Sequence, residues 1–282
     1  MRCSRSTVEN TVINLTIALR AEAAPLIQHW NLKKSATHHP FPLYEGDQAR
    51  LVVSGKGKCN SAAATSWLAS TTNNSRSIPS VWINLGIAGH KTLQLGTAVA
   101  ASKLVEDTTG YCWYPALIKN KIQQVSTVCT VDQPCLDYPD THTFDMEATG
   151  FYQTAIRFST AELTHCIKVI SDNNQNSTDN ISAGLIGELI SSNLQLITEQ
   201  CQNLQTLSDR IDWVDTADAE EHFYKQVKFS VTQKHQLRRL LVRHLAVFGH
   251  LNFDNSVPRD TSSGRATDLL RTLESSIIRP QS

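Results

Sequence analysis

Short apolar runs rich in β-branched residues alternate with helical stretches over roughly the first 205 residues, and this alternation constrains the fold more than any other feature. Helical patterns follow several of the apolar runs. Strands that alternate with helices form a mostly parallel or mixed sheet with helices on both faces. We therefore expect an α/β domain with three layers, α/β/α, around a mixed central sheet. The expected strands cover residues 12–19, 49–54, 80–85, 96–105, 124–129, 143–146 and 166–171.

Polar residues stand at the ends of these expected strands. Glu22 comes shortly after the first strand, and a glycine-bearing turn at residues 54–58 follows the second. A segment that starts at Gly86, which we expect to be a loop, follows the third, while Glu147 and Asp172 follow the last two. Ligands of open α/β sheets bind at the carboxyl ends of the strands. The sequence therefore predicts that these residues share one binding site.

The charge and the cysteines narrow the functional classes. The chain has 26 basic residues (lysine plus arginine) and 26 acidic residues (aspartate plus glutamate). It therefore has no net charge that would attract nucleic acid or an anionic membrane. The seven cysteines include no C-x-x-C pair, which favours reduced thiols over disulfides or a zinc site. The chain shows no signal-peptide pattern and no apolar run of membrane-spanning length. We expect a cytoplasmic protein with no membrane association.

The character of the sequence changes near residue 207. Residues 208–221 are acidic, residues 227–250 are basic and helical, and residues 265–278 read as a final helix. The sequence therefore predicts a first domain at 1–206 and a mainly helical C-terminal extension, 207–282, that packs on it. A basic helical stretch is usually a solvated helix face, so we do not expect nucleic-acid binding.

Five sequence strings carry a family resemblance. ALRAEAAPL, SGKGKCNSAAAT, NLGIAGHKTLQLGT, FDMEATGFYQTA and KVISD occur in the order found in nucleoside phosphorylases and nucleosidases. The chain resembles this superfamily over roughly residues 12–205, and it is most similar to the methylthioadenosine/S-adenosylhomocysteine nucleosidases. The resemblance implies a phosphorylase/nucleosidase-like fold, a purine nucleoside as ligand, and a homodimer or higher homo-oligomer. It implies no metal ion and no organic cofactor.

The resemblance also implies catalytic roles for two acidic residues and a sugar-binding role for a third. Asp172 of the Ser171–Asp172 pair matches the general acid that protonates the purine near N7 as the N-glycosidic bond breaks. Glu22 matches the glutamate that orients the attacking water. Glu147 matches the glutamate that accepts hydrogen bonds from ribose hydroxyls, and Met146 would pack against the sugar.

Other substrate contacts come from two further segments. The expected Gly86–Gly89 loop matches the family loop beneath the ribose, where glycine permits close approach of the backbone. The family strand that contacts the base would fall near residues 129–134. The resemblance implies substrate-binding positions at Gly86, Ile87, Ala88, Met146, Glu147, Lys168 and Ser171.

Departures from the family pattern favour water over phosphate as the nucleophile. Ile87 stands where related nucleosidases often carry serine or threonine, and Lys168 stands where many carry arginine. Asn84 lies in the strand end where hexameric phosphorylases place an arginine for phosphate. Arg20 and Arg50 are then the candidate phosphate ligands.

We expect hydrolysis of an adenosine-type nucleoside of the methylthioadenosine or S-adenosylhomocysteine class. A phosphate-dependent purine nucleoside phosphorylase is the alternative enzyme, because the sequence does not settle whether water or phosphate attacks the sugar. A non-catalytic nucleoside-binding protein is a further alternative, since the departures at Ile87 and Lys168 leave full activity open.

Overall fold

The computed structural model describes residues 12–71, 80–118, 120–176, 181–210, 216–249 and 266–278. These residues form two compact units, one up to residue 210 and the other from residue 216. The last helix of the first unit, α5 (Leu194–Arg210), continues past residue 206. The predicted boundary at 206/207 and the packing of the extension on the first domain stay predictions.

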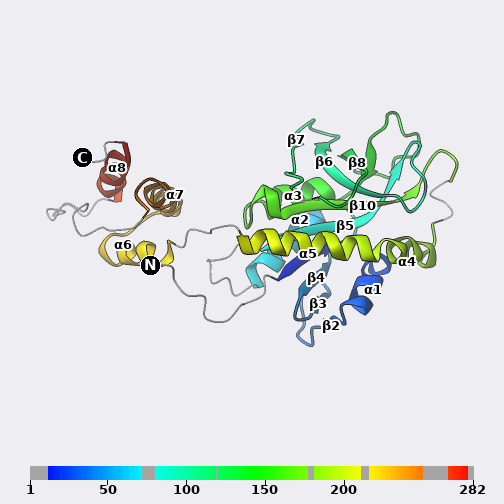
Figure 1. Cartoon of the computed structure of the whole chain (residues 1–282), viewed down its shortest axis with the longest axis horizontal. Helices are drawn as coiled ribbons and strands as arrows, with labels where there is room; N and C mark the ends of the chain where they lie inside the picture. Colours follow the sequence, from blue (N-terminus) through cyan, green and yellow to red (C-terminus); the bar gives the residue numbers. More distant parts are fainter. Residues whose placement is uncertain are drawn as a thin grey trace. The chain divides into compact units, whose positions relative to one another are not determined.

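A mixed sheet forms the centre of the first unit, as predicted (Figure 1). Its strands pair in the order β10-β6-β8-β9-β5-β1-β4-β3-β2, with β7 added on β6. The pairs β1–β4, β1–β5, β5–β10, β6–β8 and β8–β9 are parallel, and the others are antiparallel. The strands are β1 (Ile13–Ile17), β2 (Lys33–Lys34), β3 (Leu43–Glu45), β4 (Ala49–Val53), β5 (Val81–His90), β6 (Ala98–Glu106), β7 (Cys112–Trp113), β8 (Val125–Thr130), β9 (Thr143–Asp145) and β10 (Thr164–Asp172).

Part of the sheet closes on itself. Strand β5 pairs with β10 and β9, and the ring is completed by the β10–β6, β6–β8 and β8–β9 pairs. The prediction of a loop at Gly86–Gly89 is wrong, because β5 continues through this segment to His90. The physical reason is a parallel partner: Lys168 pairs with Gly86, and Val169 pairs with Ile87.

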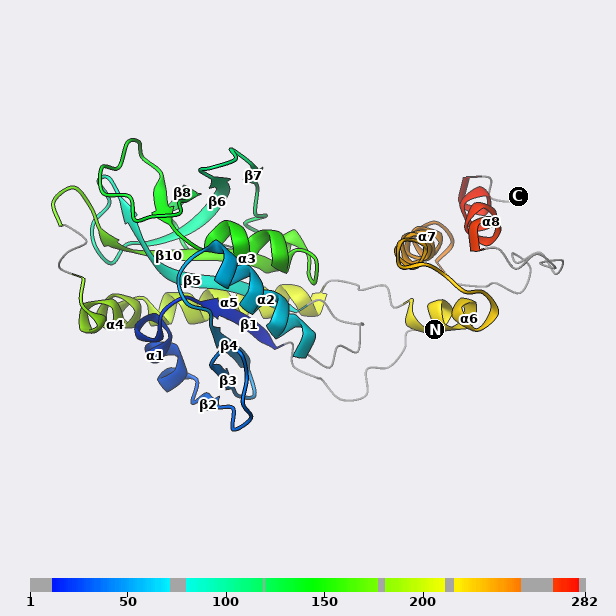
Figure 2. The ribbon, with the colours of Figure 1, turned by 180° about the vertical axis from the view of Figure 1, so that it is seen from behind.

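Helices cover both faces of this sheet (Figures 1 and 2). Helices α2 (Lys58–Thr71) and α3 (Ala148–Ala155) pack on one face. Helices α1 (Arg20–His29), α4 (Ala183–Ser192) and α5 pack on the other. A short 3-10 helix at Ala161–Leu163 precedes β10. The predicted α/β/α arrangement of three layers is confirmed.

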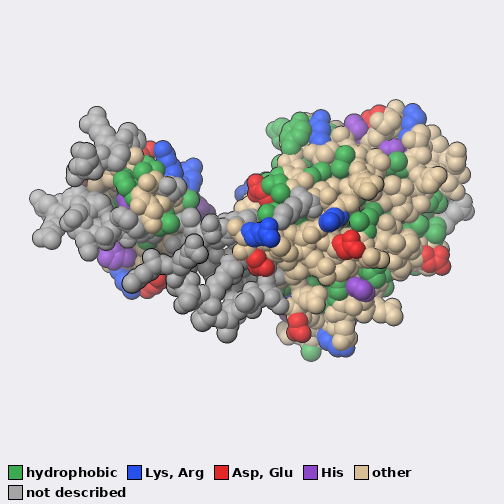
Figure 3. All heavy atoms as spheres, in the orientation of Figure 1, with side chains coloured by type: hydrophobic (Ala, Val, Ile, Leu, Met, Phe, Trp, Pro, Cys, Tyr) green, Lys and Arg blue, Asp and Glu red, His purple; other side chains and the backbone are tan. Residues whose placement is uncertain are grey.

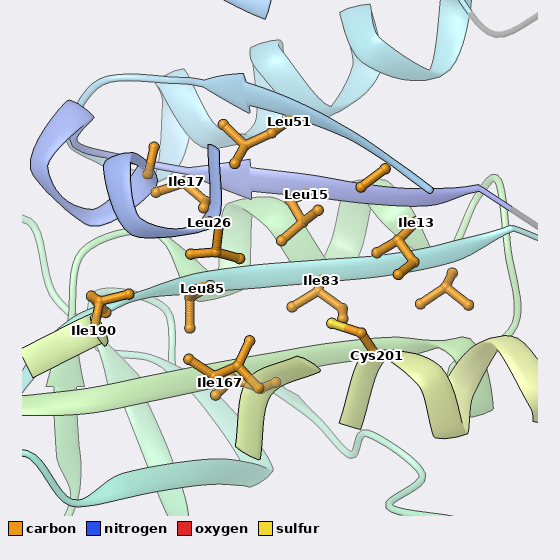
Figure 4. Close-up of a cluster of buried hydrophobic side chains, with 14 of the residues drawn as sticks. Ile13, Leu15, Ile17, Leu26, Leu51, Ile83, Leu85, Ile167, Ile190 and Cys201 are labelled. Carbon is orange, nitrogen blue, oxygen red and sulfur yellow. The ribbon is translucent and has the colours of Figure 1, made fainter. Parts of the chain in front are cut away.

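Two apolar clusters hold the layers together. Successive side chains of a strand point to opposite faces, so Ile83 joins the cluster beneath α1, α4 and α5, whereas Trp82 joins the cluster beneath α2 and α3. Figure 4 shows the first cluster, with Leu15 and Leu85 of the sheet beside Ile190 and Cys201 of the helices. Burial on both faces explains why the parallel strands read as continuous apolar runs.

The described residues of the second unit form helices, in agreement with the predicted helical extension. Helices α6 (Ala217–Gln226), α7 (Val231–Phe248) and α8 (Ala266–Ile278) share a core of their own. The N-cap of α7 is Ser230, whose hydroxyl oxygen accepts from the amide of Gln233 at 3.3 Å. The buried apolar residues of the core shared by α6, α7 and α8 are Ala219, Phe223, Val227, Leu237, Leu240, Leu241, Ala266, Leu269, Leu270, Leu273 and Ile277.

Surface charge agrees with the balanced composition. Figure 3 shows acidic and basic side chains interspersed over the visible face of the first unit. In the second unit Arg238 pairs with Glu220 at 3.8 Å. Among the described residues no helix is long and apolar enough to cross a membrane.

Candidate active site

A cavity of about 350 Å³ opens beside the carboxyl ends of β1, β5 and β10. Residues from strand ends, helix starts and connecting segments contribute to its wall, as the topology of an α/β sheet predicts. The lining residues are Ala18, Leu19, Glu22, Lys56, Ile87, Ala88, Gly89, Val131, Pro134, Cys135, Phe144, Asp145, Met146, Glu147, Ser171, Asp172, Ile181 and Ile186.

Glu22 is held in the cavity wall by backbone amides. It lies in the first turn of α1, directly after β1, and only 2% of its surface is exposed. Its Oε2 accepts from the amide of Leu19 at 2.7 Å, and its Oε1 accepts from the amide of Ile87 at 2.8 Å. Burial raises the pKa of Glu22 to about 7, although the two amides favour the charged form. This carboxyl group can therefore exchange a proton near neutral pH.

Glu147 is held in a similar way at the start of α3. Its Oε1 accepts from the amide of Gly57 at 2.7 Å. Gly57 has φ of 97°, a conformation that side-chain-bearing residues rarely adopt, so this turn requires glycine. Burial raises the pKa of Glu147, and the charge of Lys168 opposes that rise. The glycine-bearing turn that the sequence singled out therefore fixes an acidic residue of the site.

Lys168 and Asp145 form a buried ion pair in the wall of the site. The Lys168 Nζ lies 2.7 Å from Asp145 Oδ2 and 2.7 Å from Asn84 Oδ1, and the lysine is fully buried. Burial opposes its charge, but Asp145 and Glu147 outweigh that effect and raise the pKa of Lys168. Asp145 lines the cavity, whereas Lys168 does not. The structure thus places Lys168 behind the wall, where it balances the charge of the carboxylates.

Side-chain hydroxyls surround Asp172, at the end of β10. Ser171 Oγ donates to its Oδ1, and the Tyr138 hydroxyl donates to its Oδ2. Gly89 lies opposite, and a Cβ atom at that position would come within 2.5 Å of Asp172 Oδ2. Asp172 is 5% exposed and still reaches the cavity. The arrangement presents one oxygen-rich group beside a largely apolar wall.

That wall is formed by residues after β8 and before α3. Val131, Pro134 and Cys135 line it, together with Phe144 of β9. Apolar and aromatic groups of this kind suit a flat ring, with polar groups at its edge to fix its orientation. The segment overlaps the predicted base-contacting stretch at 129–134.

The structure brings most of the predicted site residues together. Two fall outside the cavity lining: Gly86 and Lys168. A Cβ at Gly86 would lie 3.0 Å from Glu22 Oε1, so this glycine makes room for the glutamate. The predicted residues that line the cavity are Glu22, Ile87, Ala88, Met146, Glu147, Ser171 and Asp172.

Neither arginine suggested for phosphate lines the cavity. The Arg20 guanidinium lies over the ring of Tyr44, 5.1 Å from its centroid, and Arg50 pairs with Glu45 at 2.9 Å. Sequence reasoning did not identify Tyr138, which lies in a segment without periodic pattern. Lys56 was noted only as part of the glycine-bearing turn, although it lines the cavity.

Solved nucleosidase structures share this fold. The 5′-methylthioadenosine nucleosidase of Arabidopsis thaliana matches with a TM-score of 0.57 and 16% identity, over 70% of this chain and 97% of that one. A Helicobacter pylori 5′-methylthioadenosine/S-adenosylhomocysteine nucleosidase matches with a TM-score of 0.54 and 12% identity, over 68% and 98% of the two chains. The futalosine hydrolase of Helicobacter pylori matches with a TM-score of 0.54 and 12% identity, over 69% and 98%.

These matches confirm the predicted phosphorylase/nucleosidase-like fold. No protein-family model matches the chain, and no curated protein matches its sequence. At these identities the likeness describes the fold, so the chemistry of this chain has to be argued from its own residues.

Proposed function

We propose that this protein is a purine nucleosidase that hydrolyses the N-glycosidic bond of an adenosine-type nucleoside. The observation that carries the proposal is the convergence of Glu22, Glu147 and Asp172 on one cavity from three separate elements. Each is at most 8% exposed and each has a specific hydrogen-bond donor. Buried acidic residues gathered in a cleft are typical of sites that move protons.

The proposed reaction assigns one task to each acidic residue. Asp172 gives its proton to the purine as the bond between C1′ and the base nitrogen breaks, and the bonding electrons move onto the purine ring. Glu147 accepts hydrogen bonds from the sugar hydroxyls and favours the positive charge that develops on the sugar. Glu22 orients a water molecule and takes its proton as the water oxygen bonds to C1′. Solvent returns a proton to Asp172 and removes one from Glu22.

We also propose the chemical class of the 5′ group of the substrate. Solved nucleosidases of this fold carry a butylthio-DADMe-immucillin or adenine in their structures. A cavity with an apolar wall and apolar residues such as Ile181 and Ile186 suits an adenosine whose 5′ group is a thioether. Methylthioadenosine and S-adenosylhomocysteine are the first candidates. We also propose that the protein is a homodimer or higher homo-oligomer and that it is cytoplasmic.

Lys56 favours a second candidate, a phosphorylase that uses orthophosphate. It is the cation among the cavity-lining residues, and no hydrogen bond or ion pair of its ammonium is found in the described part of the chain. A lysine there could attract an anion. Against this, Glu22 and Glu147 line the same cavity and repel phosphate. Water is therefore the preferred nucleophile.

The test is release of free base from a panel of adenosine derivatives that differ at the 5′ group. The proposal expects adenine release that is fastest for thioethers and that is lost in Asp172→Asn. Asp107→Asn, at an exposed acidic residue outside the cavity lining, is the matched control and should keep wild-type activity. Binding of several nucleosides without cleavage of any would favour the non-catalytic alternative.

A further inference from the structure

Tyr138 lies in an unusual position for a bulky residue. It belongs to the segment between β8 and β9, has no regular secondary structure, and is only 3% exposed. Its φ is 40°, in the left-handed region. Among the described non-glycine residues, only Asn31 also has a positive φ. Such a conformation is unfavourable for a residue with a side chain and persists only where the surroundings impose it. The packing around Tyr138 therefore imposes this backbone conformation.

The surroundings of Tyr138 converge on Asp172. Its hydroxyl donates to Asp172 Oδ2, while its ring lies against Phe144 with 6.1 Å between centroids. A Cβ at Gly89 would lie 2.7 Å from the Tyr138 ring and 2.5 Å from Asp172 Oδ2. Glycine at this position of β5 thus leaves room for both partners.

Tyr138 lies behind the cavity wall. Asp172 and Phe144 line the cavity, but Tyr138 does not. Its hydroxyl therefore reaches Asp172 without itself lining the cavity. Resting on the proposed function, we propose that Tyr138 is a positioning residue that fixes Asp172 against the purine and stabilises the carboxylate left after proton transfer.

The chemistry of the pair supports this role. When Asp172 has given its proton to the base, it carries a negative charge in a site largely shielded from water. A hydroxyl that donates to this charge lowers the free energy of the state after transfer, because hydrogen bonds to charged groups are stronger than those to neutral ones. Ser171 supplies a second hydroxyl at Oδ1. With both oxygens engaged, the carboxyl plane is held in one orientation.

The first test is Tyr138→Phe, which keeps the ring and removes only the hydroxyl. We expect kcat to fall about 10- to 100-fold, the range for losing a hydrogen bond to a charged group, with KM changed less than about threefold. Tyr152→Phe, at another tyrosine that is 3% exposed, is the matched control and should change neither value. A kcat equal to that of wild type, or a KM that rises as much as kcat falls, would overturn the inference.

A second test needs no turnover and separates this inference from the proposed function. Tyrosine labelled with ¹³C at Cζ gives one resonance per residue, and Tyr138→Phe identifies that of Tyr138. We expect this resonance to shift in Asp172→Asn and to stay in place in Asp107→Asn. An identical Tyr138 resonance in wild type and Asp172→Asn would overturn the pairing. If the resonance shifts but wild-type protein cleaves no nucleoside, the proposed reaction is wrong and the contact between Tyr138 and Asp172 still holds.

Discussion

Three acidic residues of the cavity, Glu22, Glu147 and Asp172, are held in two different ways. Glu22 and Glu147 accept hydrogen bonds from backbone amides of Leu19, Ile87 and Gly57. Asp172 instead accepts from side-chain hydroxyls. Backbone amides are fixed by the fold itself and survive most substitutions. Hydroxyl donors depend on particular side chains, so the Asp172 side of the cavity should be the more sensitive to mutation.

The difference also shows which group suits which task. A carboxylate that accepts from amides of the fixed backbone, two for Glu22 and one for Glu147, is held in place, as a group that positions water or sugar hydroxyls must be. An acid that gives up its proton changes charge during the reaction, and hydroxyls can reorient as it does so. Single substitutions in and around the cavity test this division.

Asp172→Asn should abolish most activity while the fold persists. The amide has the shape of the acid but cannot deliver its proton, and general acid catalysis typically contributes ~10²–10⁴-fold. We expect turnover of adenine nucleosides to fall by about that factor, measured by adenine release at saturating substrate. Unchanged turnover would remove Asp172 from the mechanism.

Lys168→Met should lower the stability of the folded protein. It would leave Asp145 and Glu147 buried without their counter-charge, and breaking a buried ion pair costs about 3–5 kcal/mol. We expect the free energy of unfolding to fall by that amount in denaturant titration. Lys103→Met, at a lysine outside this cluster, is the control and should change it little. A loss below 1 kcal/mol, against the typical cost of about 3–5 kcal/mol, would contradict the role given to Lys168.

Glu22 should give the protein a recognisable pH dependence. Its pKa is raised to about 7 in the folded state, so kcat/KM should rise with pH through about 7 as the carboxylate forms. Because the folded protein holds this proton more tightly than the unfolded chain, stability should decrease between pH 5 and 7, by up to about 1.4 kcal/mol per pH unit. Glu22→Gln should lose both the activity limb and this part of the stability slope. Denaturant titrations at pH 5, 6, 7 and 8 measure the slope, and an equal slope in both proteins would refute the assignment.

The C-terminal unit should have the smallest effect on the chemistry. Its helices have their own core, and no residue beyond Ile186 lines the cavity in the described part of the chain. We expect a chain ending near residue 210 to keep the relative kcat/KM for two nucleosides within about threefold, since this ratio reflects contacts in the cavity. Stability or solubility should change more than substrate preference. A soluble truncation with altered preference would contradict this expectation.

The sequence could predict the acidic residues for a physical reason. Glu22, Glu147 and Asp172 each follow an apolar run closely, and the topology of an α/β sheet brings strand ends together. It could not predict that β5 continues through Gly86–Gly89, because a glycine-rich string reads as a loop until its partner β10 is known. The role of Tyr138 could not be predicted either, because its left-handed backbone and its contact with Asp172 depend on tertiary packing.

The identity of the sugar product distinguishes hydrolysis from phosphorolysis. Wild-type protein and Glu22→Gln would be incubated with methylthioadenosine in phosphate-free buffer and in buffer with phosphate, and the products separated and identified by mass. We expect free sugar and adenine at equal rates in both buffers, with a sharp loss of hydrolysis in Glu22→Gln while the nucleoside still binds. Cleavage that requires phosphate and yields sugar 1-phosphate would contradict it and establish the phosphorylase.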